Sequence, residues 1–175
     1  MSTPEIFEEM EYKGKLGETF KLLCFDIYND YELYILSLGS HPTAYIVLEE
    51  DDKLYGLDMC ELDEISDLHC HGGFTYAENT LTIPGYSYVN EHEKKWVIGW
   101  DYGHHMDWTT LIPEAIQKEF GFKKWTTQEV LDECRRVIDS IIEYNKMDGG
   151  RYKCLIQTNL KKKWKTTKEN EKKKD

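Results

Sequence analysis

Residues 126–147 read Thr-Thr-Gln-Glu-Val-Leu-Asp-Glu-Cys-Arg-Arg-Val-Ile-Asp-Ser-Ile-Ile-Glu-Tyr-Asn-Lys-Met, and this stretch decides the fold class. Thr126 and Glu129 have the spacing of a capping box, in which each side chain accepts a hydrogen bond from the other residue's backbone N–H. Apolar side chains then recur at helical spacing and form one stripe, at Val130, Cys134, Val137, Ile138, Ile141 and Ile142. The stretch predicts a helix from about Thr127 to Met147, ended by Asp148-Gly149-Gly150, with one face buried against a second layer.

That second layer is predicted to be a sheet. Two β-favouring runs, Phe20–Tyr28 and Glu32–Leu38, flank Asn29-Asp30 and indicate a hairpin. Further strands are expected at Thr43–Leu48, Thr80–Ile83, Lys95–Asp101 and, after the helix, Tyr152–Gln157. The fold class is therefore α+β, with a largely antiparallel sheet covered by one long C-terminal helix.

Two segments are less regular. Ser2-Thr3-Pro4-Glu5 has an N-cap followed by proline, which predicts a short helix to about Glu11. Asp67–Tyr76 is compatible with a strand broken by Gly72-Gly73.

Length and charge indicate one domain with a tail. The chain has 175 residues and a net charge of −11, unevenly spread. From residue 161 onward there are 8 Lys and three acidic residues, whereas residues 1–160 hold 14 basic and 30 acidic side chains. We expect a single α+β domain over 1–160 and a flexible, Lys-rich tail over 161–175. The acidic domain should repel duplex nucleic acid.

The chain also lacks membrane and export signals. No apolar run approaches the roughly 20 residues of a membrane helix, and the acidic N-terminus is unlike a signal peptide. Five widely spaced cysteines without a CxxC pair indicate reduced thiols rather than disulfides or a zinc knuckle. A cytoplasmic protein without membrane contact is expected, and a homo-oligomer stays open.

Four of the six histidines lie in two short stretches. The first contains His69 and His71, followed by Gly72-Gly73, whose backbone can approach a ligand closely. If that stretch is extended, both imidazoles lie on one face. In the second, Asp101, His104 and Asp107 are spaced three apart, with His105 between them. We predict that the two stretches meet in space and line one pocket.

Three interpretations of these groups remain open. One is a divalent transition-metal site, drawing on His71, Asp101, His104 and Asp107 with His69 as a further ligand. Another is a metal-free site for a small anion, in which glycine N–H groups and histidines bind phosphates while Tyr76, Trp100 or Tyr102 stacks on a base. In the third, the groups are structural and satisfy buried polar atoms. Cys70 is discounted as a nucleophile.

Three ordered motifs resemble a family of small phage and prophage accessory proteins. They are His71-Gly72-Gly73-Phe74-Thr75-Tyr76, then Gly99-Trp100-Asp101 with His104 and Asp107, then the Thr126–Cys134 helix start with Val130 and Glu133 in register; His41-Pro42 precedes them. The resemblance spans about residues 40–142, and the family is uncharacterised.

The resemblance implies a counter-defence protein in the cytoplasm of a host cell. Such a protein would bind and sequester, or hydrolyse, a nucleotide-derived immune signal. The residues expected to bind that ligand are His69, His71, Gly72, Gly73, Tyr76, Trp100, Asp101, Tyr102, His104 and Asp107. Two alternatives are an acidic inhibitor that binds a host defence protein directly, through a surface such as Glu49-Glu50-Asp51-Asp52, and a metal-dependent phosphodiesterase.

Overall fold

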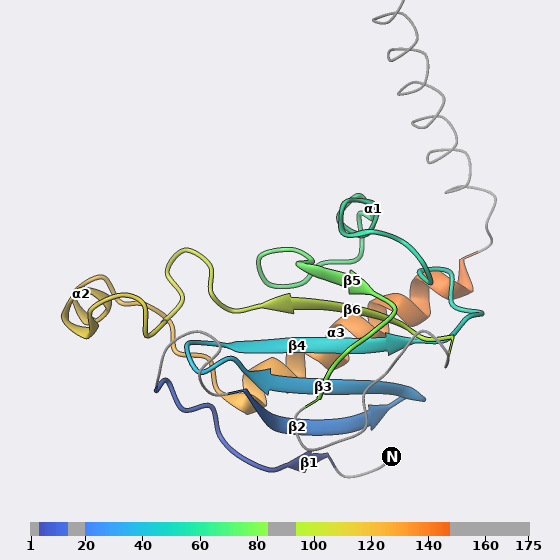
Figure 1. The fold of residues 1–175 in the computed structure, drawn as a ribbon. Coiled ribbons are helices and arrows are strands. Elements are labelled where there is room, and N and C mark those ends of the chain that lie inside the picture. Colours follow the sequence, from blue (N-terminus) through green and yellow to red (C-terminus); the bar gives the residue numbers. More distant parts are fainter. Residues whose placement is uncertain (1–3, 14–19, 84–93, 148–175) are drawn as a thin grey trace, which may run out of the picture. The chain divides into compact units, whose positions relative to one another are not determined.

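The computed structural model describes residues 4–13, 20–83 and 94–147. They build a six-stranded sheet of order β1-β2-β3-β4-β6-β5, in which every neighbouring pair is antiparallel, with one long helix, α3 (Figure 1). The strands are β1 (Glu5–Ile6), β2 (Lys21–Tyr28), β3 (Tyr31–Ser37), β4 (Pro42–Leu48), β5 (Tyr76–Glu78) and β6 (Trp96–Asp101). The helices are α1 (Met59–Asp63), α2 (Glu114–Glu119) and α3 (Thr127–Lys146). The α+β prediction is confirmed.

The predicted hairpin and helix form for the local reasons given above. Asn29 and Asp30 both have positive φ (50° and 70°), as a two-residue turn between twisted strands requires. At the start of α3, Thr126 N donates to Glu129 Oε2 (2.9 Å) and Glu129 N donates to Thr126 Oγ1 (3.2 Å). The capping box is therefore present.

Each face of the sheet has its own apolar cluster. On one face, alternate residues of the central strands pack with the apolar stripe of α3; they include Leu33, Ile35, Ile46, Ile98, Val130, Val137 and Ile141. On the other face lie Leu22, Leu36, Val47 and Val97, which are covered by Leu81 and Ile83. An ion pair also joins helix to sheet, because Arg135 Nη2 lies 2.7 Å from Oδ2 of the buried Asp26.

The predicted N-terminal helix is wrong. Its described part contains β1, in which Glu5 pairs with Phe25 of β2, followed by irregular chain. Its backbone groups bond outward rather than internally: Phe7 N donates to Leu23 O (2.8 Å) and Met10 N donates to Thr127 Oγ1 (3.0 Å). The sheet edge and the start of α3 thus offer this segment partners that its sequence does not reveal.

Two predicted strands are also absent. Residues 67–75 form turns, and pairing begins only at Tyr76, because Gly72 and Gly73 have φ of 70° and 89° and Gly73 N bonds back to Cys70 O (3.3 Å). Thr80–Ile83 is not an extended strand, although Leu81 and Ile83 are buried.

Further predictions fall outside the described residues. These are the strand at Tyr152–Gln157, the helix stop at Asp148-Gly149-Gly150, the boundary at residue 160 and the tail. The chain divides into a compact unit over Met1–Tyr144 and a second unit over Asn145–Asp175. Among the described helices, none combines the length and apolar character needed to cross a membrane.

Candidate functional site

The two histidine stretches meet at His71, as predicted. Its Nε2 lies 2.6 Å from Asp107 Oδ2, and its ring stacks on Tyr102 with centroids 5.0 Å apart and planes 5° from parallel. The ring also contacts Trp125 (4.8 Å) and His104 (5.5 Å between centroids). With Nε2 occupied, Nδ1 has no hydrogen bond to any described residue, and 26% of the side chain is exposed.

Asp107 is the buried acceptor that joins the two stretches. Besides His71, it accepts hydrogen bonds from Trp125 Nε1 (2.8 Å) and from the backbone N–H of His104 (3.0 Å). Its side chain is only 3% exposed. Trp125 and the His104 backbone N–H hold the Asp107 carboxylate in place. The carboxylate in turn orients the His71 imidazole and favours a proton on its Nε2, as carboxylates do behind catalytic histidines.

Glu133 ties the same loop to α3. One carboxylate oxygen accepts from the His71 backbone N–H (3.0 Å) and from Arg136 Nη2 (2.7 Å). The other accepts from the Tyr102 hydroxyl (2.7 Å), which itself accepts from Trp100 Nε1 (3.0 Å). Burial raises the pKa of Tyr102, so its hydroxyl remains a donor.

A second group lies beside this network. Asp101 Oδ1 is 3.7 Å from His104 Nε2 and 3.9 Å from His41 Nε2, and it accepts from Gly103 N (2.9 Å). His104 Nε2 is a buried atom without a hydrogen bond to any described residue. The backbone of Gly72 lies against this ring, since a Cβ built at Gly72 would be 2.0 Å from His104 Nε2.

Several residues predicted to contact a ligand are not available for it, either because they are buried at the site or because they lie elsewhere. Trp100 and Tyr102 are 1% and 0% exposed, so neither ring has a free face for a base. Tyr76 packs on the other face of the sheet, beside Tyr45. His69 is exposed, and its carbonyl accepts from Arg136 (3.0 Å).

The glycine loop does not form a phosphate cradle either. The backbone N–H groups of residues 71, 73, 74 and 75 all donate within the protein, to Glu133, Cys70 O, Asp63 and Gly99 O. The structure adds a reason to discount Cys70 as a nucleophile. Burial above all, and then the Glu133 and Asp63 carboxylates, raise the pKa of its thiol, which disfavours the reactive thiolate.

The metal interpretation gains no support from the geometry. Among the described residues, no group of three or more His, Cys, Asp or Glu side chains is placed to hold a metal ion. His71 and Asp107, two of the four predicted ligands, bond to each other instead.

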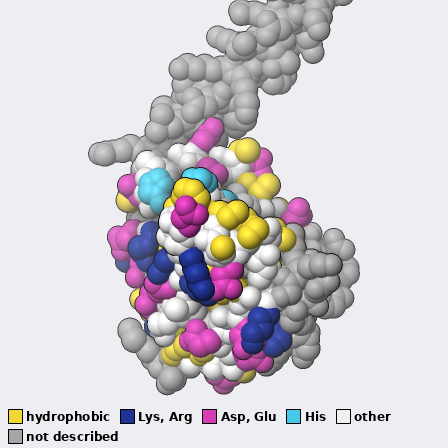
Figure 2. Space-filling model, turned by 90° about the vertical axis from the view of Figure 1, so that its left-hand side faces the viewer, with side chains coloured by type: hydrophobic (Ala, Val, Ile, Leu, Met, Phe, Trp, Pro, Cys, Tyr) yellow, Lys and Arg dark blue, Asp and Glu magenta, His cyan; other side chains and the backbone are white. Residues whose placement is uncertain are grey.

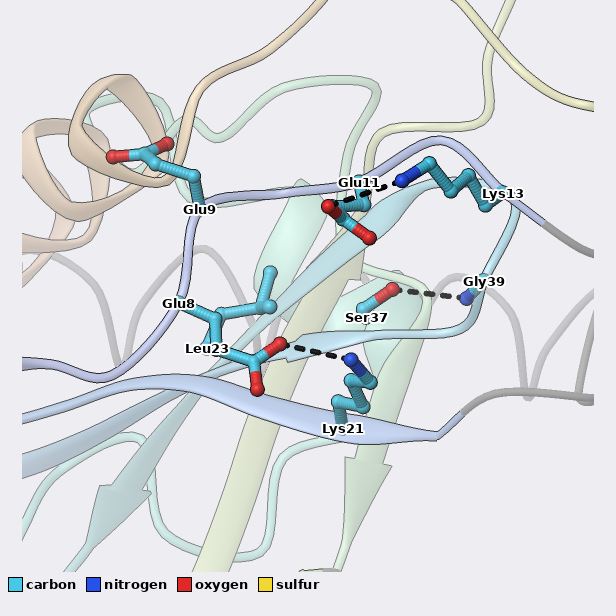
Figure 3. A pocket seen from close by; sticks show the side chains of 8 residues that line it. All are labelled: Glu8, Glu9, Glu11, Lys13, Lys21, Leu23, Ser37 and Gly39. Atoms are coloured by element: carbon cyan, nitrogen blue, oxygen red, sulfur yellow. Dashed lines mark hydrogen bonds and ion pairs between the residues drawn. The ribbon is translucent and has the colours of Figure 1, made fainter.

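The candidate residues do not line either of two hollows in the protein. The smaller, of about 60 Å³, lies between the N-terminal segment and the open end of the hairpin, where β2 begins and β3 ends (Figure 3). Both of its lysines are paired, Lys13 with Glu11 (3.2 Å) and Lys21 with Glu8 (2.9 Å), and it is too small for a nucleotide. The larger, of about 460 Å³, lies between residues 108–117, Tyr12 and Lys124. The predicted proximity of the two histidine stretches is thus confirmed, but they line neither of these hollows.

The acidic turn Glu49-Glu50-Asp51-Asp52 is less available to bind a partner protein than its sequence suggests. Glu49 pairs with Lys95, and Glu50 pairs with Lys94 (3.1 Å). Asp52 accepts from the Tyr31 hydroxyl (2.7 Å) and from Leu54 N (2.8 Å), so it has a structural role.

Three residues of the site were missed as candidates by reasoning from the sequence: Trp125, Glu133 and His41. Glu133 and His41 belong to the residues that carry the resemblance but were not predicted to bind a ligand, and Trp125 directly precedes the capping box. Residue spacing alone does not indicate that these side chains contact residues 68–76 or 101–107.

His41 makes stability depend on pH. Burial lowers its pKa below the usual 6.5, although Asp101 opposes the shift. As pH falls below about 6.5, the unfolded chain takes up a proton that the folded protein accepts only at lower pH, so stability falls with pH in this range. We expect His41→Gln to flatten this slope in urea unfolding between about pH 5 and 7. The exposed His105, changed to Gln, is the matched control; equal slopes in both variants would contradict the assignment.

Comparisons with protein families, with curated proteins and with solved structures find no match to this chain.

Proposed function

We propose that the protein binds a nucleotide-derived anion at the exposed edges of His71 and His104. The observation that carries this proposal is the pairing of two partly exposed imidazoles, 5.5 Å apart between centroids, each beside an aspartate: His71 beside Asp107, and His104 beside Asp101. Imidazoles can donate hydrogen bonds to phosphate oxygens, and their charge changes near neutral pH. The resemblance to phage accessory proteins would make the ligand a host immune signal, and binding would sequester it.

Local charge supports an anionic ligand despite the acidic domain. Arg136 lies beside the His71 loop, and Lys123 Nζ lies 5.1 Å from the centre of the Trp125 ring that contacts His71. Both cations lie near residues of the site, although each also pairs with a glutamate, Arg136 with Glu133 and Lys123 with Glu129. Nearby cations partly offset the repulsion from distant carboxylates, which salt screens.

The same pair of groups also suits metal-free hydrolysis. One imidazole can remove a proton from water while another protonates the leaving oxygen of a phosphodiester, and such proton transfer accelerates reactions typically 10²–10⁴-fold, as an order of magnitude. In this role Asp107 is a positioning residue that acts through His71. Sequestration and hydrolysis thus share one site and differ in the fate of the ligand.

Calorimetry against cyclic dinucleotides, cyclic oligonucleotides and ADP-ribose derivatives tests the proposal. For a ligand that binds, His71→Ala and His104→Ala should each weaken affinity by about tenfold or more, because a hydrogen bond to a charged group is lost. His105→Ala, an exposed histidine of the same loop, should change affinity little. Circular dichroism would verify that each variant is folded. Recovery of intact ligand would indicate sequestration, and cleaved product hydrolysis.

Direct binding to a partner protein is the second candidate function. It is favoured by three exposed apolar side chains near α2, namely Leu111 (61%), Ile116 (43%) and Phe120 (61%). Figure 2, which views the end of the fold that carries α2, shows apolar side chains gathered among charged ones. Large exposed apolar side chains of this kind recur in protein interfaces. Absence of binding and turnover across the whole nucleotide panel would overturn the first proposal and leave this one.

A further inference from the structure

The larger hollow has the size and preformed walls of a small-molecule site. Its volume of about 460 Å³ falls within the range of ligand pockets. Gln117, 1% exposed, fixes one wall, because its Oε1 accepts from Thr109 N (2.7 Å) and its Nε2 donates to Thr109 O and Ile112 O (both 2.7 Å). A wall held in this way needs little ordering when a ligand binds.

The base of this wall is joined to the segment that precedes α3. Trp108 N donates to Lys123 O (2.7 Å), and Lys123 N donates to Met106 O (2.8 Å). On the opposite side, the Tyr12 hydroxyl donates to Trp125 O (3.0 Å) and accepts from Trp125 N (2.7 Å). Three segments far apart in sequence thus hold Trp108, Tyr12 and Lys124 around one space.

Lys124 supplies an available positive charge. Its Nζ lies 4.0 Å from the centre of the Trp108 ring and 6.0 Å from that of Tyr12. Among the described residues, no carboxylate lies within ion-pair distance of it, whereas Lys118 pairs with Glu114 (2.7 Å) and Lys123 with Glu129. In a domain where acidic residues outnumber basic ones, an ammonium that contacts aromatic rings and makes no ion pair within the described residues can bind an anion.

We propose that this hollow binds a phosphate-bearing small molecule with a planar ring, through the Lys124 ammonium and the half-buried Tyr12 ring, beside the largely buried Trp108 (8% exposed). Glu114 also lines the hollow and attracts Lys124 electrostatically, but its carboxylate pairs with Lys118 (2.7 Å). The phosphate would bind the Lys124 ammonium, and the planar ring would lie against Tyr12, because the Trp108 ring is largely buried and contacts Lys124. None of these residues belongs to the histidine site, so the two proposals stand or fall separately.

Adenosine monophosphate is the probe, with calorimetry for affinity and the indole N–H signal of Trp108 in heteronuclear NMR spectra for location. We expect saturable binding with a shift of the Trp108 signal, and adenosine without its phosphate should bind about tenfold more weakly or worse. Lys124→Met should weaken binding by about tenfold, since a charge-assisted contact is lost. Lys94→Met removes the same charge at an exposed lysine that belongs to neither site and is the control, expected to change affinity less than about twofold.

The variant His104→Ala separates this proposal from the proposed function. Binding of adenosine monophosphate in the hollow should survive this change, whereas binding at the histidine site should not. The proposal is overturned if wild-type protein shows no saturable binding below about 1 mM, if the two lysine variants behave alike, or if His104→Ala abolishes the binding.

Discussion

Replacing Asp107 with alanine is expected to lower the free energy of unfolding by about 3–5 kcal/mol, because a buried charged acceptor is removed from three donors. Those donors are His71 Nε2 (2.6 Å), Trp125 Nε1 (2.8 Å) and the backbone N–H of His104 (3.0 Å). The side chain is 3% exposed, so water cannot easily replace it. Urea unfolding at neutral pH measures the loss through the shift of the midpoint at constant slope.

Two further variants define the origin of this loss. Asp107→Asn keeps one acceptor oxygen but turns an amide N–H₂ toward a donor, so we expect it to be destabilising by about half as much as alanine. Asp51→Ala removes an exposed carboxylate and should stay within about 0.5 kcal/mol of the wild type. A loss below about 1 kcal/mol for Asp107→Ala would show that the network does not hold the two histidine stretches together.

Gly72→Ala is the second change with a large expected effect, about 2–4 kcal/mol, since a left-handed backbone and a close contact both oppose the new methyl group. Gly72 has φ of +70°, and its Cβ would lie 2.0 Å from His104 Nε2. Gly121 has nearly the same φ, +69°, with nothing within 4 Å of a Cβ. Gly121→Ala therefore carries the backbone strain alone, about 1 kcal/mol, and the difference between the variants measures the contact.

A double variant tests the cause directly. Combining Gly72→Ala with His104→Ala removes the ring that the methyl group meets, so most of the excess over Gly121→Ala should be recovered. Chemical denaturation supplies all four stabilities of the cycle. Equal losses for Gly72→Ala and Gly121→Ala would mean that the His104 ring moves aside at no cost, which would contradict a close approach of backbone to imidazole.

Local signals predicted most of the regular structure. The capping box and apolar stripe of α3, the Asn29-Asp30 turn and the alternation in β6 are all readable within a few residues, because each depends on backbone geometry and on period. The N-terminal segment shows where such signals end. Its Ser-Thr-Pro-Glu start suits a helix, but pairing with β2 and a bond to Thr127 compete with it from far along the chain.

At the candidate site, the sequence identified several of the residues, whereas their contacts and burial became clear only from the structure. The sequence alone determined that His71, His104, Asp101 and Asp107 are grouped in two unusual stretches, and that the domain is acidic. Only the tertiary structure decided that Trp100 and Tyr102 are core residues and that Asp107 accepts three hydrogen bonds. It also showed that Glu133, 62 residues from His71, accepts a hydrogen bond from the His71 backbone N–H. The physical reason is that burial and hydrogen-bond partners are set by contacts between β6, the glycine loop and α3, which no local pattern encodes.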